Sequence, residues 1–151
     1  MENKMSLRIS AKSQNESFAR FVIAAFAASA NPTIDEINDI KTAVSEAITN
    51  CVVHAYKRRQ NQNDLITIDC ELHNSSLTIK IADNGVGIPN VIQAMQPFFT
   101  TEHNGERSGM GFTVMQSFMD ELSVQSTTNG TEVIMKKTFT EEENKQEAAG
   151  D

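Results

Sequence analysis

The sequence predicts an α+β fold, a two-layer sandwich in which helices cover one face of a mixed, mostly antiparallel sheet. Two capping boxes, at residues 13–16 and 33–36, each precede apolar residues at helical spacing. Apolar and polar residues then alternate over 65–82, and Asn129-Gly130 is a hairpin signal between two more alternating runs. The resulting order of strand, two helices, two strands, helix and two strands is typical of this architecture.

The first half of the chain is expected to form one strand and two helices. Residues 5–10 alternate weakly, which predicts a strand. The first capping box pairs Ser13 with Glu16 and is expected to open a helix that ends near residue 29. The predicted inward stripe of this helix is Phe18, Val22, Ala25, Phe26 and Ser29. The second box is expected to open a longer helix that runs to about Lys57.

Six further elements are expected in the second half of the chain. They are strands at 65–72 and 77–82, a short helix at 90–95, a helix at 112–119, and strands at 123–127 and 131–138. Asn74-Ser75 is expected to be the turn between the first two of these strands. The stretch 97–111 shows no periodicity and is rich in Thr, Gly and charge.

Composition excludes several classes of function. The 151 residues suffice for one domain, expected at 1–140, and no apolar run approaches a membrane span. The N-terminus has no apolar signal segment, which predicts a cytoplasmic protein. A net charge of −7 without a basic stripe argues against direct nucleic-acid binding. The acidic residues 141–151 are expected to be a disordered tail, and Cys51 and Cys70 to be buried thiols.

Asp83 stands at the end of the predicted strand 77–82 and is followed by Gly85 and Gly87. A buried carboxylate there can accept from an exocyclic amine such as that of adenine. The two glycines would let the backbone approach a flat ring or a phosphate closely. The alternative is a tight turn that uses Asp and Gly for purely local reasons.

Glu46 and Asn50 are four residues apart on the long predicted helix, so their side chains share one face. Asn50 offers a neutral oxygen that suits Mg²⁺, and Glu46 is a candidate catalytic base. The alternative is an ordinary solvated helix face.

A third motif precedes the predicted helix 112–119. It comprises Arg107, Ser108, Gly109, Met110 and Gly111. Free amides at a helix N-terminus favour anions, so these residues are candidates for phosphate binding. A simple glycine-containing loop is the alternative.

In this order the three motifs resemble the N, G1 and G2 boxes of the GHKL, or Bergerat-fold, ATPases. The resemblance implies that Asn50 binds Mg²⁺ and that Asp83 binds the adenine amine of ATP or ADP. It also implies that the segment between the second and third motifs is an ATP lid. The other nucleotide-binding positions that it implies are Gly85, Gly87, Thr100, Thr101, Ser108, Gly109, Met110 and Gly111.

Longer segments resemble the family of sporulation anti-sigma-F factors, which are small serine kinases. The segments are 13–20, 44–50, 96–101, 106–112 and 118–120, within a resemblance that covers roughly 5–138. It implies a homodimer that inhibits a sigma-F-type sigma factor. It also implies phosphorylation of a serine on an anti-anti-sigma protein. Arg20 would contact these partners, whereas the sequence alone also allows a solvated arginine.

One departure from the family pattern lies in the lid, where Glu102-His103 replaces a common Lys-Pro. The replacement puts an anion near the phosphates, so Arg107 is the better candidate for pairing with the γ-phosphate. Three alternatives stay open. They are a docking module without kinase activity, a kinase of a general-stress sigma factor, and a histidine-kinase catalytic domain. Little room upstream of residue 5 for a phosphoacceptor helix pair argues against the last.

Overall fold

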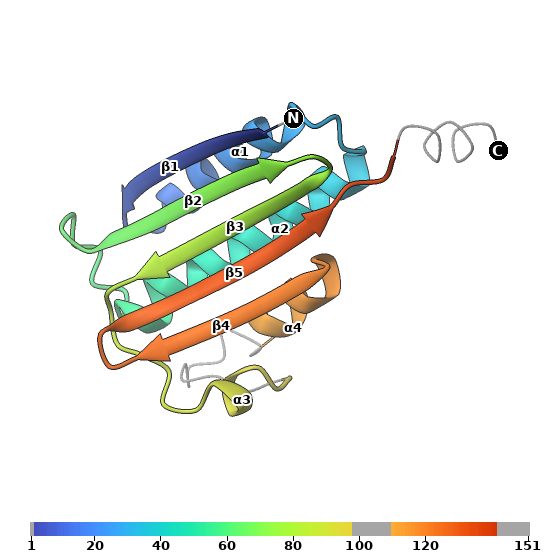
Figure 1. Ribbon diagram of the computed structural model, residues 1–151. Coiled ribbons are helices and arrows are strands. Elements are labelled where there is room, and N and C mark those ends of the chain that lie inside the picture. Colours follow the sequence, from blue (N-terminus) through green and yellow to red (C-terminus); the bar gives the residue numbers. More distant parts are fainter. Residues whose placement is uncertain (1, 98–109, 142–151) are drawn as a thin grey trace.

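The computed structural model describes residues 2–97 and 110–141 (Figure 1). Its strands are β1 (Glu2–Ser10), β2 (Leu65–His73), β3 (Ser76–Asp83), β4 (Glu121–Thr127) and β5 (Gly130–Thr138). Its helices are α1 (Asn15–Ala28), α2 (Ile34–Asn50), α3 (Val91–Ala94) and α4 (Gly111–Phe118), and a π-helical turn, η1 (Cys51–Ala55), continues α2. The expected order of elements is confirmed.

The strands form one sheet in the order β1-β2-β3-β5-β4, with every neighbouring pair antiparallel. The α+β class is therefore confirmed, but the sheet is antiparallel throughout rather than mixed. Helices α1 and α2 lie against one face of it, and α2 packs between α1 and α4 (Figure 1). Alternation along the strands sends one set of side chains into this layer. The fully buried core residues include Ile40, Ile48, Ile68, Ile79, Ile81 and Met135.

The two predicted capping boxes have different outcomes. The second is confirmed: the Glu36 amide donates to Thr33 Oγ1 at 3.1 Å, and the Thr33 amide donates to Glu36 Oε2 at 2.7 Å. The first is wrong, because α1 begins at Asn15 without a side-chain cap. Ser13 instead accepts at Oγ from Gln60 Nε2 at 2.9 Å. A contact from the loop after η1 thus replaces the local cap.

The inward face of α1 also differs from the prediction. Its buried residues are Ala19, Ile23 and Ala27, whereas the side chains of Phe18 and Phe21 are 50% and 58% exposed. Small alanines at the interface let α1 approach its neighbours closely. The predicted stripe lies one position away from the buried face, and of its members Phe26 still packs against the core.

The turn signals are largely confirmed. The hairpin at Asn129-Gly130 joins β4 to β5, and Gly130 has φ +142°, a conformation that L side chains rarely adopt. Asn74 has φ 54° in the turn between β2 and β3.

In the described part of the chain no helix has the length and apolar character of a membrane span. Of the expected tail, only Glu141 is among the described residues.

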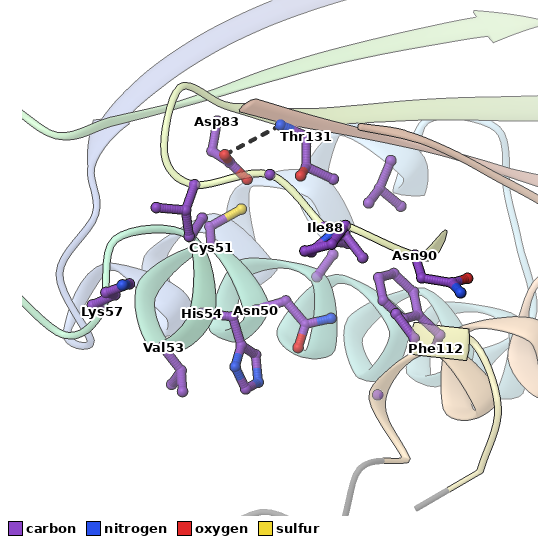
Figure 2. A pocket seen from close by; sticks show the side chains of 18 of the residues that line it. Asn50, Cys51, Val53, His54, Lys57, Asp83, Ile88, Asn90, Phe112 and Thr131 are labelled. Atoms are coloured by element: carbon purple, nitrogen blue, oxygen red, sulfur yellow. Dashed lines mark hydrogen bonds between the residues drawn. The ribbon is translucent and has the colours of Figure 1, made fainter. Parts of the chain in front are cut away.

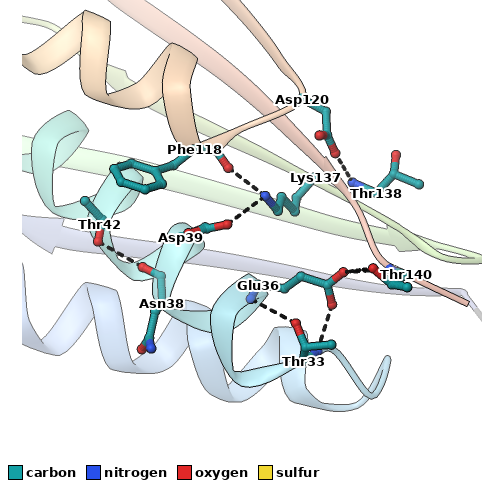
Figure 3. A network of polar contacts seen from close by, with 10 residues as sticks. All are labelled: Thr33, Glu36, Asn38, Asp39, Thr42, Phe118, Asp120, Lys137, Thr138 and Thr140. Atoms are coloured by element: carbon teal, nitrogen blue, oxygen red, sulfur yellow. Dashed lines mark hydrogen bonds and ion pairs between the residues drawn. The ribbon is translucent and has the colours of Figure 1, made fainter. Parts of the chain in front are cut away.

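A buried polar network joins α2, α4 and β5 (Figure 3). Lys137, at 9% exposure, donates to Asp39 Oδ2 at 3.1 Å and to the Phe118 carbonyl at 2.7 Å. Glu36 Oε1 accepts from the amide and the hydroxyl of Thr140, each at 2.7 Å. These bonds hold the C-terminal end of α4 and the end of β5 against α2, and so help to position the N-terminal end of α4.

Candidate functional site

A cavity of about 680 Å³ opens between the end of α2, η1, the loop after β3, α3 and the start of α4 (Figure 2). Its volume lies within the range of small-molecule sites. Its lining is mostly apolar, with Ile88, Phe112 and Val133 among the contributing side chains. Its polar lining residues include Asn50, His54, Lys57, Asp83, Asn90, Gln93 and Thr131.

Asp83, the last residue of β3, is 8% exposed and lines this cavity. Its Oδ1 accepts from the amides of Gly85, at 3.0 Å, and Thr131, at 3.3 Å. The thiol of Cys51 lies beside the carboxylate (Figure 2). Burial raises the pKa of Asp83 above its ordinary value, and these hydrogen bonds oppose the rise. The side chain is a fixed acceptor on the cavity wall.

The glycines after Asp83 allow its loop to pack tightly. A Cβ on Gly87 would lie 1.8 Å from the Thr127 carbonyl oxygen, and one on Gly85 would lie 2.3 Å from that of Ala55. The amide of Val86 donates to the same Ala55 carbonyl at 2.9 Å. Gly87 lines the cavity, whereas Gly85 supports it by its bond to Asp83. Both glycines therefore have a steric role within the protein itself.

Glu46, Asn50 and Gly111 lie together although they come from two separate motifs. A Cβ on Gly111 would lie 3.3 Å from both Asn50 side-chain polar atoms and from Glu46 Oε2. Asn50 and Gly111 line the cavity, and Glu46 stands one turn before Asn50 on α2. Met110 directly precedes α4. The N-terminus of α4, whose first amides have no acceptor within the helix, therefore lies next to Glu46 and Asn50.

Five predicted site residues lie outside the described part of the chain: Thr100, Thr101, Arg107, Ser108 and Gly109. Glu102-His103, the pair that differs from the family pattern, also lies outside the described residues.

Arg20 lies on α1 and does not line the cavity. Its guanidinium pairs with Glu16 at 3.5 Å, donates to Ser45 Oγ at 3.5 Å and stacks over the Phe21 ring at 5.4 Å from the centroid. Ser45 in turn donates to Glu16. The side chain of Arg20 is 32% exposed. The arginine is thus held in a network between α1 and α2 and is not simply solvated.

Sequence reasoning missed the role of several residues at the site. Thr131 binds Asp83 because the register of β3 and β5 places them opposite each other. Tyr56 donates to the Leu65 carbonyl at 2.6 Å and accepts from the Asn84 amide at 2.8 Å, which braces the loop after Asp83. His54 also lines the cavity, one turn after Asn50.

Both cysteines are buried and free, as predicted. Burial raises the pKa of the Cys70 thiol to about 12. For Cys51, burial and the nearby charge of Asp83 raise the thiol pKa well above its usual range. Cys51 lines the cavity, which the sequence reading did not anticipate, whereas Cys70 is not among the lining residues.

The described residues fit a nucleotide and a hard cation. Asp83 supplies an acceptor at one end of the cavity, and Asn50 supplies a neutral oxygen beside the N-terminus of α4 at the other. Mg²⁺ commonly takes a few protein oxygens together with phosphate oxygens and water. The described residues contain no group of three or more His, Cys, Asp or Glu side chains that could hold a metal by themselves.

Comparisons with known proteins agree with this geometry. The family described as histidine kinase-like ATPase domain matches residues 9–137. The anti-sigma F factor of Clostridium beijerinckii is 53% identical over 139 residues, covering 91% of this chain and 96% of its own. That of Caldanaerobacter subterraneus is 58% identical over 136 residues, covering 89% and 93%.

Solved structures are similar in fold at low identity. The RsbU and RsbW domains of Rv1364c from Mycobacterium tuberculosis match with a TM-score of 0.67 and 16% identity, covering 92% of this chain and 33% of that one. The catalytic domain of histidine kinase ThkA matches with a TM-score of 0.56 and 14% identity, covering 91% and 97%. The chain belongs to the histidine kinase-like ATPase domain family and, within it, to the anti-sigma F factors.

Proposed function

We propose that this protein is an ATP-dependent serine kinase that inhibits a sporulation sigma factor of the sigma-F type. It phosphorylates a serine of an anti-anti-sigma antagonist and thereby inactivates it. The observation that carries the proposal is the convergence of Asn50, Asp83 and Gly111 on one cavity, with Glu46 next to Asn50 and Gly111. The similar proteins named anti-sigma F factor support the choice of partner.

The adenine of ATP would lie at the Asp83 end of the cavity. Asp83 Oδ1 already accepts two backbone amides, so the carboxylate keeps further acceptor capacity for the exocyclic amine. Ile88, Phe112 and Val133 supply apolar wall beside it. A buried charged acceptor would reject a base that presents a carbonyl there, because the two acceptors would face each other.

The triphosphate would extend toward Asn50 and the N-terminus of α4. Free amides at Gly111 and its neighbours favour anionic oxygens. Asn50 would hold Mg²⁺ through its side-chain oxygen, and the bound ion would neutralise charge that develops on the phosphate oxygens. Arg107, Ser108 and Gly109, with Thr100 and Thr101 of the lid, would contribute to the same end of the site; these five lie outside the described residues.

Glu46 would orient the partner's serine hydroxyl and accept its proton. Its Oε2 lies on the same side of Gly111 as the Asn50 amide, so the base and the cation ligand are adjacent. Phosphoryl transfer depends mainly on positioning and charge stabilisation, and a placed carboxylate adds the proton acceptor that a hydroxyl requires.

The partners would dock on the α1 side of the molecule. Arg20 lies there over the exposed ring of Phe21, Phe18 is a further exposed ring on α1, and arginine with aromatic side chains is common at interface centres. The protein would work in the cytoplasm as a homodimer, bind no DNA or membrane directly, and cycle between ATP and ADP.

Transfer of label from γ-labelled ATP to a purified anti-anti-sigma domain tests the proposal. Wild type with Mg²⁺ should label a serine of the domain, and Asn50→Ala should not. Glu71→Gln is a matched control, because Glu71 is exposed on β2 and away from the cavity. ATP binding and sigma binding without any label transfer by the wild type would instead favour a docking module.

A further inference from the structure

Cys51 occupies a position that the site described so far does not use. It is the first residue of η1, follows Asn50 directly and is 5% exposed. It lines the cavity, as Asp83 does. Figure 2 shows the Cys51 sulfur beside the Asp83 oxygens, on the helix side of the carboxylate.

The amides that donate to Asp83 come from the sheet and its loops. The amides of Gly85 and Thr131 both donate to Oδ1. Two donors on one oxygen leave the carboxylate some freedom to turn, because the terminal torsion of Asp has a broad energy minimum. A donor on the helix side, where the Cys51 sulfur lies, would restrict that rotation, since it would approach from a different side.

We propose that Cys51 is a positioning residue that holds Asp83 in the orientation needed to accept the amine of a purine. This inference rests on the nucleotide site proposed above and deepens it. The thiol acts through Asp83, which would itself contact the base. Its contribution therefore concerns only ligands that carry the 6-amino group.

The local structure keeps Cys51 in place. The Cys51 carbonyl accepts from the Tyr56 amide at 3.0 Å across the π-helical turn. Tyr56 in turn is fixed to Leu65 and to the amide of Asn84, the residue after Asp83. Cys51 and Asp83 are thus tied to the same framework, as a positioning pair requires.

Cys70 provides a matched control in the same chain. It is also a buried, free cysteine, at 2% exposure, but it lies on β2 and does not line the cavity. Replacing it with alanine removes the same atoms from the core without touching the donor set of Asp83.

The experiment is calorimetric titration of the full chain with ATP and with purine riboside triphosphate, which lacks the 6-amino group. The variants are Cys51→Ala, Cys51→Ser and Cys70→Ala. Cys51→Ala should weaken ATP affinity by about 3- to 10-fold, the scale of one hydrogen bond, and change affinity for the analogue by less than about 2-fold. Cys51→Ser restores an O–H donor and should stay within about 2-fold of wild type for ATP.

The results distinguish a failure of the Cys51 role from a failure of the proposed nucleotide site. An equal loss of both nucleotides in Cys51→Ala would overturn the inference, as would a Cys51→Ser variant that behaves like alanine or a Cys70→Ala variant that loses ATP selectively. Wild type that binds neither nucleotide would overturn the proposed site itself. Wild type that binds both nucleotides equally would overturn the role of Asp83, and the inference with it.

Discussion

The backbone amide of Thr131 donates to Oδ1 of Asp83 at 3.3 Å, which links two residues 48 positions apart in the chain. The bond exists because β3 and β5 pair in a register that sets these residues opposite each other. Asp83 is thereby fixed at the sheet edge of the cavity, between the start of β5 and the thiol of Cys51.

Asp83→Asn should weaken ATP binding by about 1–3 kcal/mol, because a charge-assisted bond is lost and an amide donor can face the adenine amine. Calorimetric titration with ATP checks this. Asp69→Asn is a suitable control, since Asp69 lies on β2 in a strand position that alternates with the buried residues. Equal affinity in Asp83→Asn and wild type would place the adenine elsewhere.

The affinity of the wild type for ATP should decrease at acidic pH. Burial raises the pKa of Asp83 above its ordinary 3.8, with hydrogen bonds from Gly85, Cys51 and Thr131 opposing the rise. The carboxylate therefore takes up a proton at a higher pH than a free aspartate and then loses acceptor capacity toward the amine. Titrations over a pH series should show a loss of ATP affinity that Asp83→Asn lacks. Parallel pH profiles for the two proteins would contradict this assignment.

Gly87→Ala should destabilise the protein, because its Cβ would lie 1.8 Å from a backbone oxygen of Thr127 that no rotamer change can move. A loss of about 1–3 kcal/mol in the free energy of unfolding is expected from overpacking of this kind. Denaturant unfolding measures it.

Gly111→Ala offers the comparison for that experiment. Its Cβ would approach only the side chains of Asn50 and Glu46, at 3.3 Å. The stability should change by less than about 1 kcal/mol, because alanine favours the helix and the neighbouring side chains can adjust. A stability loss as large as that of Gly87→Ala would contradict the packing described for these two glycines.

Thr140→Val should reduce stability at neutral pH by about 1 kcal/mol, since a hydroxyl hydrogen bond to a carboxylate is lost. Burial raises the pKa of Glu36, but hydrogen bonds from Thr140 and Thr33 outweigh it and hold the pKa below the ordinary 4.5. A lowered native pKa stabilises the fold above pH 4.5, and this stabilisation is lost as the pH falls through the native pKa.

The two proteins should therefore approach each other in stability as the pH falls below 4.5 and through the lowered native pKa of Glu36. Unfolding of wild type and Thr140→Val across a pH series tests the convergence. A stability difference that stays constant from pH 7 to pH 3 would show that the hydroxyl bond is not coupled to the charge of Glu36.

Local patterns predicted the parts of the structure that local physics determines. Alternation over 65–82 gave the central strands, and the Asn129-Gly130 signal gave the last hairpin. Glu46 and Asn50 were found from helical spacing, and Asp83 from its place at a strand end. Their meeting at one cavity followed from the family resemblance and was not visible in any single motif.

The errors arose where distant contacts decide the outcome. Ser13 is engaged by Gln60 rather than by the helix that it precedes, and Glu16 is engaged by Ser45 and Arg20. In α1 the small Ala19 and Ala27 are buried while Phe18 is half exposed, so the predicted stripe lies off the buried face, although Phe26 packs against the core. Thr131 acquires its role only through strand register, which one sequence does not reveal.

The most direct test of the account is a paired measurement on Glu46→Gln. This variant keeps the shape of the side chain beside Asn50 and Gly111 but cannot accept the serine proton. ATP affinity by calorimetry should stay within about 3-fold of wild type. Transfer of the γ-phosphate to the anti-anti-sigma serine should fall by about 10²–10⁴-fold, the usual scale for a general base. Unchanged transfer, with ATP still bound, would contradict the assignment of Glu46 as the catalytic base.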